Sequence, residues 1–112
     1  MRRILIIEDD PAILTGLTES LESENYKVIF SSDGLKGYQM AQKEKVDLII
    51  LDIMLPNKNG IEICKDLRNE KNNTPIETIR FIGNTLPFLP QFILTYYTPK
   101  TILSRDDFSE WR

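Results

Sequence analysis

Acidic side chains end two apolar runs in this chain. Glu8 and Asp9 follow the run Arg3–Ile7. Asp52 follows the run Leu48–Leu51, and a loop rich in Pro, Asn and Gly comes directly after it. Runs of this kind suit strands buried on both faces of a parallel sheet, and open α/β sheets bind ligands at the carboxyl ends of such strands. If the two strands are neighbours, the three carboxylates meet at one point.

Three carboxylates at one point repel one another unless a cation joins them. A hard divalent cation such as Mg²⁺ takes one or two protein carboxylates, keeps several waters and binds a phosphate oxygen. A backbone carbonyl just after Asp52 would add a further ligand. The chemistry that follows is phosphoryl transfer, in which the metal neutralises charge and a carboxylate acts as the nucleophile to give an aspartyl phosphate.

Taken singly, each acidic residue has a simpler interpretation as a helix cap or a surface charge. Asp10 is interpreted as the N-cap of a helix with Pro11 at its first position, where a missing N–H costs nothing. Cys64 is interpreted as core packing, because its helical spacing points it inward. A functional site is favoured by the combination of two acidic strand ends, the order of the elements and the loop after Asp52.

The composition is that of a single soluble globular domain of 112 residues, with 28% charged and 41% hydrophobic residues. A net charge of −3 without a stripe of Lys and Arg gives no basis for binding nucleic acid. The apolar runs are far shorter than the roughly 20 residues that span a bilayer, and no signal peptide is recognised. With Cys64 as its one cysteine and no histidine, the chain has no internal disulfide or histidine chemistry, and we expect a cytoplasmic location.

Up to Ile76 the spacing predicts alternating strands and helices. Strands are expected at 3–8, 26–30 and 47–51, and helices at 11–23, 34–44 and from Asn59-Gly60 to 71–73. Residues expected to face the core are Ile13, Leu14, Leu17 and Leu21 in the first helix, Leu35, Tyr38 and Ala41 in the second, and Ile61, Ile63, Cys64 and Leu67 in the third. This order predicts right-handed crossovers and an α/β fold with a doubly wound parallel sheet.

Residues 1–76 closely resemble the receiver domain of two-component response regulators, particularly receivers that precede a winged-helix DNA-binding domain. The matching motifs are Ile4–Pro11, Asp33-Gly34, Asp47–Pro56 and Asn59-Gly60. The resemblance implies a flavodoxin-like receiver fold and a sensor histidine kinase as the phosphoryl donor in a phosphorelay. It also implies that Asp52 is the phosphoacceptor. Mg²⁺ would be held by Glu8, Asp9, Asp52 and the backbone carbonyl of Met54.

The chain departs from the receiver pattern after Ile76. Receivers carry a Thr or Ser at the end of an apolar fourth strand and a Lys-Pro at the end of a fifth. Here the hydroxyl position falls on Arg80, and the segment Thr98-Pro99-Lys100 has the order reversed. We therefore expect a fold that is incomplete or irregular after residue 76, and no credible equivalent of the fifth strand and last helix.

Residues 77–112 are accordingly expected to form a divergent segment and no separate domain, as a frameshift or a truncation would produce. Such a receiver would accept phosphate and switch poorly, and it would not bind DNA directly. An insertion that displaced the fourth strand is the alternative, because Pro90–Thr95 repeats the expected spacing from Pro to Thr. Otherwise Pro90–Thr95 is a coincidental apolar run packed against a sheet edge, and Thr95 and Lys100 remain open as substitutes for the missing residues.

Two rival functions come from other classes. The first is a phosphorylation-independent module that binds a protein partner through the N-terminal face. The second is a Mg²⁺-dependent phosphatase, but such enzymes need a second aspartate two residues after the nucleophile, where this chain has Met54. We therefore expect a phosphate acceptor and no turnover enzyme. An uncovered sheet edge would favour a homodimer or aggregation.

Overall fold

The computed structural model describes residues 1–81 and 92–96, and the side chains of residues 1–78. Within these residues the elements are β1 (Arg3–Ile7), α1 (Pro11–Ser23), β2 (Lys27–Ser31), α2 (Gly34–Lys43), β3 (Leu48–Asp52), α3 (Gly60–Asn69), β4 (Ile76–Phe81) and β5 (Phe92–Tyr96). The three helices and first three strands lie within two residues of the predicted ranges, apart from the end of α3. None of these helices is long and apolar enough to cross a membrane.

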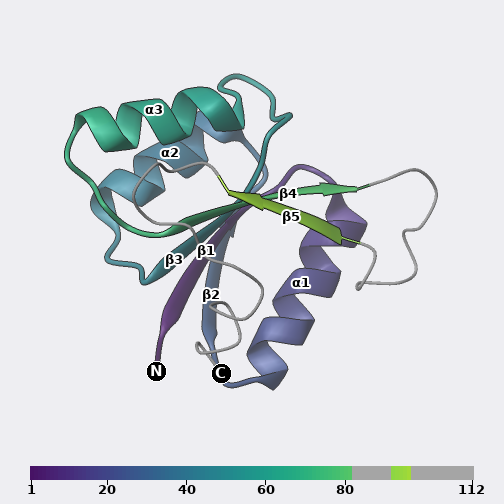
Figure 1. Ribbon diagram of the computed structural model, residues 1–112. Helices are drawn as coiled ribbons and strands as arrows, with labels where there is room; N and C mark the ends of the chain where they lie inside the picture. Colours follow the sequence, from purple (N-terminus) through teal and green to yellow (C-terminus); the bar gives the residue numbers. More distant parts are fainter. Residues whose placement is uncertain (82–91, 97–112) are drawn as a thin grey trace.

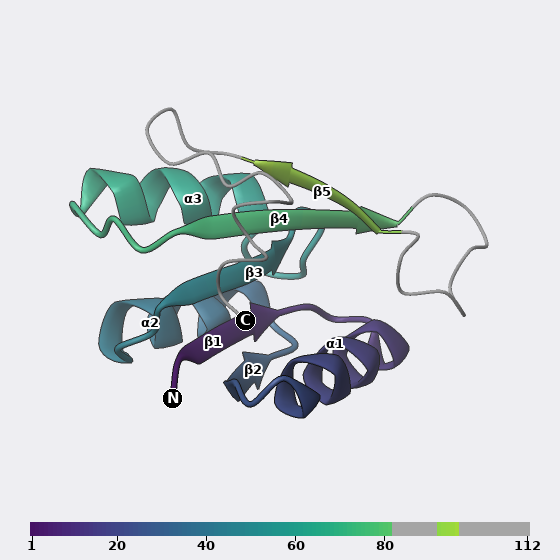
Figure 2. The same ribbon diagram turned by 60° about the horizontal axis from the view of Figure 1, so that its bottom comes forward.

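The strands form one sheet in the order β2-β1-β3-β4-β5. Neighbours among the first four strands run parallel, and β5 runs antiparallel to β4. Figures 1 and 2 show α1 on one face of the sheet and α2 and α3 on the other. The predicted doubly wound α/β fold is confirmed. In this strand order the carboxyl ends of β1 and β3 lie side by side, at the point where such folds bind ligands.

Apolar side chains of the central strands are buried on both faces of the sheet. The cluster beneath α1 contains Ile4, Ile6, Ile13, Leu17, Leu21, Tyr26, Leu48 and Ile50. The cluster beneath α2 and α3 contains Leu5, Ile7, Ala41, Ile49, Leu51, Ile63, Cys64, Leu67 and Ile76. Full burial of an Ile or Leu side chain contributes about 1.5–3 kcal/mol. These two clusters therefore hold β1 and β3 in register, and Cys64 belongs to the core as predicted.

Polar residues define where each helix begins. The side chains of Asp10, Asp33 and Asn59 accept hydrogen bonds from backbone N–H groups in the first turns of α1, α2 and α3. The side chain of Glu62 also reaches back to the N–H of Asn59, which completes a capping box. Each cap satisfies donors that the start of a helix leaves without partners, so the caps fix the loops that lead into the helices.

Two residues predicted to face the core are instead exposed. Leu35 is 46% exposed and Ile61 is 40% exposed. In α2 the buried stripe runs through Gly34, Gly37 and Ala41. A Cβ atom added to Gly37 would lie 2.6 Å from the side chain of Ile7. The helix therefore packs so closely on β1 that no side chain larger than that of glycine fits at position 37, which explains a glycine inside the helix. With this face of α2 turned toward β1, Leu35 points outward.

The strands after α3 correct part of the sequence prediction. Ile76–Phe81 forms β4 itself, beside β3, so the alternative of a displaced fourth strand is wrong. The apolar run supplies β5, an added antiparallel strand at the sheet edge, where the other interpretation of Pro90–Thr95 placed it. Because β5 is antiparallel, its last residue Tyr96 pairs with Glu77, away from the end of the sheet that carries Asp52. Lys100 lies outside the described residues.

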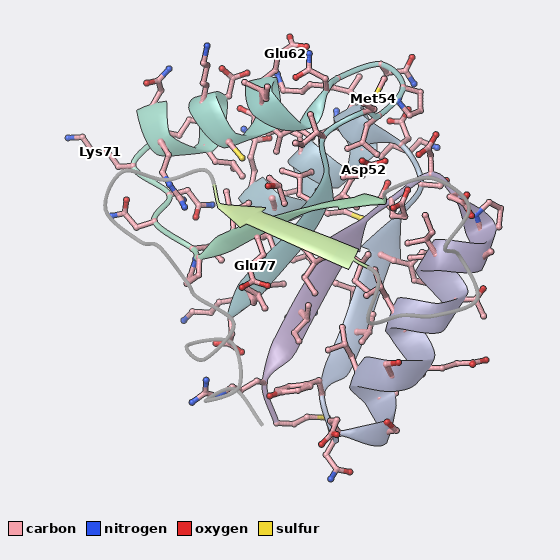
Figure 3. The ribbon with its side chains drawn as sticks, turned by 45° about the vertical axis from the view of Figure 1, so that its right-hand side comes forward. Asp52, Met54, Glu62, Lys71 and Glu77 are labelled. Atoms are coloured by element: carbon pink, nitrogen blue, oxygen red, sulfur yellow. The ribbon has the colours of Figure 1, made fainter. Side chains whose placement is uncertain are left out.

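Glu77 is a carboxylate in the interior of the protein. Its side chain is fully buried, and neither carboxylate oxygen has a hydrogen-bond partner in the described part of the chain. Figure 3 places Glu77 on β4 close to β5, well away from Asp52. Burial raises the pKa of Glu77 to about 7. A buried carboxylate without a partner destabilises the folded state whenever it is ionised.

We predict that Glu77→Gln stabilises the protein in a pH-dependent way. Between its ordinary pKa of 4.5 and about 7, the unfolded state releases the Glu77 proton before the folded state does, so the stability of the native chain falls as pH rises. The variant lacks this loss, and its advantage in free energy of unfolding should grow by about 3 kcal/mol between pH 4 and pH 8. Urea unfolding across this range measures it. Exposed Glu19→Gln is the matched control, and an advantage independent of pH would contradict the prediction.

Candidate functional site

The pairing of β1 with β3 places the acidic residues together. Ile7 pairs with Leu51 across the two parallel strands, so Glu8 and Asp52 follow at the same level. Carboxylate oxygens of Glu8, Asp9 and Asp52 all lie within 4.8 Å of one another. The structure thus brings together the three carboxylates that the sequence analysis singled out, at the end of the sheet where open α/β folds bind ligands.

Glu8 is the buried member of this cluster. Its side chain is 1% exposed. Burial raises the pKa of Glu8 to about 8, and the charge of Asp52 adds to the rise, while the Asp10 N–H, 3.0 Å from Oε2, opposes it. Glu8 therefore holds a proton at neutral pH in the metal-free protein. A cation that binds here must displace that proton.

Asp52 is half-buried at the mouth of the cluster. Burial raises the pKa of Asp52 above its ordinary value, and the charge of exposed Asp9 acts in the same direction. The Met54 N–H donates to Oδ1 of Asp52 at 3.2 Å and partly offsets the rise. Asp52 thus combines access to solvent with a fixed orientation, which is what an acceptor of an incoming group requires.

The loop after Asp52 turns back sharply against the end of β3. The Gly60 N–H donates to the Ile53 carbonyl at 2.7 Å. A Cβ atom on Gly60 would lie 2.5 Å from the carbonyl oxygen of Asp52, so only glycine fits where α3 begins. Figure 3 shows Met54 beside Asp52 at this end of the sheet. The backbone of Met54 therefore lies next to the acidic cluster, and its role as a carbonyl ligand stays a prediction.

The start of α1 adds a favourable field to the site. This helix begins at Pro11, two residues after Asp9, and Asp10 caps it by accepting from the N–H groups of Ala12 and Ile13 at 2.9 and 3.2 Å. Asp10 is therefore an N-cap, as predicted, and lies outside the cluster of three. The positive end of the helix dipole favours an anion such as phosphate nearby.

The expected hydroxyl position lies close to Asp52 along the sheet. Asp52 pairs with Ile79 on β4, and Arg80 is the next residue. Thr95, the substitute that the sequence left open, pairs with Thr78 one level further from the site. The side chains of Arg80 and Thr95 lie outside the described residues, so their contribution to the site stays a prediction.

One contact near the site was not predicted from the sequence. The side chain of Asn57, in the loop after β3, donates a hydrogen bond to Asp33 at the start of α2. The two residues are far apart in the sequence, so helix and strand periodicity carry no signal for their contact. The only sequence signal was the residue types: the adjacent Asp33 and Gly34, and Asn57 in the loop, are typical of turns with polar side-chain contacts.

Comparison with known families decides the class of the protein. Residues 4–80 match the family described as the response regulator receiver domain. The chain belongs to this family. Its match runs through most of β4, four residues beyond the point where the resemblance was expected to end. The predicted domain boundary at residue 76 itself stays a prediction.

Curated relatives of this receiver include a transcriptional regulatory protein and a response regulator. It is 47% identical over 75 residues to the alkaline phosphatase synthesis transcriptional regulatory protein PhoP of Bacillus subtilis, covering 67% of this chain and 31% of PhoP. It is 45% identical over 85 residues to the response regulator ArlR of Staphylococcus saprophyticus, covering 76% of this chain and 38% of ArlR. The chain therefore spans about a third of the length of these relatives, and the predicted subgroup agrees with them.

Solved structures of receivers share the fold. The receiver domain of sensor histidine kinase PA1611 from Pseudomonas aeruginosa, described with a magnesium ion coordinated in its active-site cleft, gives a TM-score of 0.67 at 29% identity, covering 76% of this chain and 70% of that chain. The response regulator TrrA from Thermotoga maritima, in complex with Mg²⁺-BeF, gives a TM-score of 0.65 at 33% identity, covering 68% and 66%. These receivers bind magnesium, and the present receiver has a matching candidate acidic group.

We predict that Asp52→Asn stabilises the metal-free receiver at alkaline pH. Above the Glu8 pKa of about 8, Glu8 and Asp52 are both ionised and repel each other, and the substitution removes one charge. The gain in free energy of unfolding should be about 1 kcal/mol at pH 9 and should shrink toward pH 6, where Glu8 is protonated. Urea unfolding in the presence of a chelator measures it.

Asp47→Asn is the matched control for this prediction. Asp47 lies at the opposite end of β3, where its Oδ2 accepts the Arg3 N–H at 2.8 Å. It is remote from the cluster, so its substitution should give no gain that grows with pH. A wild-type receiver that is as stable as Asp52→Asn at pH 9 would contradict the repulsion.

Proposed function

We propose that Asp52 of this receiver accepts a phosphoryl group, with Mg²⁺ held by the carboxylates of Glu8, Asp9 and Asp52 and by the carbonyl of Met54. The observation that supports this most is the convergence of three carboxylates within 4.8 Å at the switch point of the sheet. Oxygen ligands of this kind are those that Mg²⁺ prefers. The magnesium described in the two receiver structures makes the same metal the natural choice here.

The residues of the site have separate roles in the proposed reaction. A bound Mg²⁺ would neutralise charge on the transferring group. A carboxylate oxygen of Asp52 forms the bond to phosphorus while the bond from phosphorus to the donor's leaving group breaks. The Met54 N–H holds Oδ1 of Asp52 in place, and Glu8 loses its proton when the cation enters. Half-burial keeps Asp52 within reach of a donor.

The proposed donor is a sensor histidine kinase, which makes this chain a component of a cytoplasmic two-component phosphorelay. Receivers are generally not enzymes, and the proposal likewise assigns Asp52 as an acceptor of phosphate and no turnover activity. The matched region, residues 4–80, is the receiver alone, so we propose no direct binding of nucleic acid by it. The described residues offer no observation that favours a phosphorylation-independent module over this function.

The proposed response to phosphorylation is weak. A switch needs a ligand that binds two states of the protein differently. Arg80 stands at the position where receivers carry a hydroxyl, and the antiparallel β5 ends away from Asp52. In receivers that hydroxyl and the lysine after the fifth strand contact the phosphoryl group, so here the phosphoryl group would lack both partners. The apolar sequence of β5 at the sheet edge, Phe92–Tyr96, is the place where self-association is expected.

We predict that Asp52 alone takes phosphate from acetyl phosphate, and only with Mg²⁺ present. Intact-protein mass spectrometry should show one added phosphate, which is lost on treatment with hydroxylamine because an acyl phosphate is labile. Asp52→Asn should abolish the addition, whereas Asp47→Asn should keep it. Phosphate that survives hydroxylamine, or that persists in Asp52→Asn, would contradict the assignment.

We predict that Mg²⁺ binds more tightly as pH rises toward the Glu8 pKa of about 8 and no more tightly above it. Below that pKa a proton on Glu8 competes with the cation, so affinity should rise by up to about tenfold per pH unit. Isothermal titration calorimetry between pH 6 and pH 9 measures this. Glu8→Gln should bind weakly with little dependence on pH, and Glu19→Gln should behave as wild type. A flat profile in the wild type would contradict the role of Glu8.

A further inference from the structure

The loop that follows Asp52 rests directly on the start of α2. The Gly34 N–H donates to the Pro56 carbonyl at 3.1 Å. A Cβ atom on Gly34 would lie 1.8 Å from the carbonyl oxygen of Lys58, so any larger residue would push the loop away. The backbone of the loop and the first turn of α2 therefore touch without intervening side chains. A shift of one must move the other.

Asp33 uses its two carboxylate oxygens for two different contacts. Oδ2 accepts the Lys36 N–H at 2.8 Å and caps α2, while Oδ1 accepts the side-chain amide of Asn57. The Lys36 N–H, and then the Asn57 amide, hold the pKa of Asp33 below its ordinary value. Asn57 has a φ of 68°, in the left-handed region that Asn tolerates better than most residues. Together Asp33 and Asn57 form a clasp between α2 and the loop.

Met54 lies between the clasp and the end of β3. On one side its N–H donates to Asp52, and three residues later Asn57 is held by Asp33. Beyond the clasp, the ammonium of Lys58 pairs with Asp66 on α3 and lies 4.6 Å from the centre of the Tyr38 ring on α2. The loop is therefore anchored on both sides of the Met54 carbonyl.

We propose that Asp33 and Asn57 are positioning residues for the site: their clasp directs the Met54 carbonyl and thereby sets the affinity for Mg²⁺. This inference rests on the proposed function, because it requires the cation to bind beside Met54. Neither residue touches the cation in this scheme. Their effect passes through the backbone of residues 54–57, where a displacement of a few tenths of an ångström matters because Mg²⁺ demands near-ideal octahedral geometry.

Two variants separate the clasp from the stability of the helix. Asp33→Ser keeps an N-cap of similar quality for α2 but has only one oxygen, which the cap occupies. Asn57→Gly removes the amide and keeps a residue that adopts a positive φ without strain. Asn25→Gly is the matched control, because Asn25 has a φ of 69° in the turn after α1, remote from the site.

The experiment measures the Mg²⁺ dissociation constant by calorimetry, and the hydrogen-exchange rate of the Met54 amide by NMR, in wild type, the two clasp variants, their double variant and Asn25→Gly. Loss of the hydrogen bond between Asn57 and Asp33 loosens the loop next to Met54, so each clasp variant should bind Mg²⁺ roughly fivefold more weakly and exchange the Met54 amide faster. Asn25→Gly should match wild type. The double variant Asp33→Ser/Asn57→Gly should be no weaker than either single one, because both remove the same contact.

Three outcomes would overturn the inference, and they differ in what else they overturn. If wild type binds Mg²⁺ and the dissociation constants of the clasp variants lie within twofold of the wild-type value, the clasp has no positioning role, and the proposed function is left intact. If Asn25→Gly weakens Mg²⁺ binding as much as the clasp variants do, the effect comes from general stability. That outcome rejects the positioning role of the clasp and leaves the proposed function intact. A wild-type protein that does not bind Mg²⁺ overturns the proposed metal site, and the clasp with it.

Discussion

The parallel pairing of β1 with β3 is the constraint on which the rest of the structure depends. Ile7 lies opposite Leu51, and each strand continues from there into acidic residues. The register is strongly specified, because both strands bury apolar side chains on the two faces of the sheet and a slip by one residue would exchange those faces. Burial of the core therefore forces Glu8 and Asp52 together, although the two side chains repel each other when both are ionised.

Two buried carboxylates, those of Glu8 and Glu77, lie in different surroundings. Glu8 lies at the end of the sheet, beside half-buried Asp52 and close to the N-terminus of α1, where a bound cation would offset the cost of its burial. Glu77 lies within β4 without a hydrogen-bond partner among the described residues. The first carboxylate reduces stability in a way that the proposed function requires. The second destabilises the protein without a role that the structure reveals.

The sequence predicts local features of this protein well, and contacts between distant segments less well. Apolar runs, caps and turn residues were enough to locate the first six elements, the doubly wound sheet and the cluster of Glu8, Asp9 and Asp52. The outward turn of Leu35 was missed, because the close approach of α2 to β1 is a tertiary property. The antiparallel direction of β5 was missed for a similar reason: it depends on pairing with β4, and the sequence of Phe92–Tyr96 carries no sign of direction.

The central claim is that the carboxylates of Glu8, Asp9 and Asp52, together with the Met54 carbonyl, form one divalent-cation site. The most direct test is a crystal structure of the receiver grown with Mn²⁺, which substitutes for Mg²⁺ and gives an anomalous signal. The account predicts a single strong anomalous peak within about 2.5 Å of carboxylate oxygens of Glu8, Asp9 and Asp52 and of the Met54 carbonyl oxygen. Saturating Mn²⁺ with no peak at this position, or a peak bound by other residues of the chain, would contradict it.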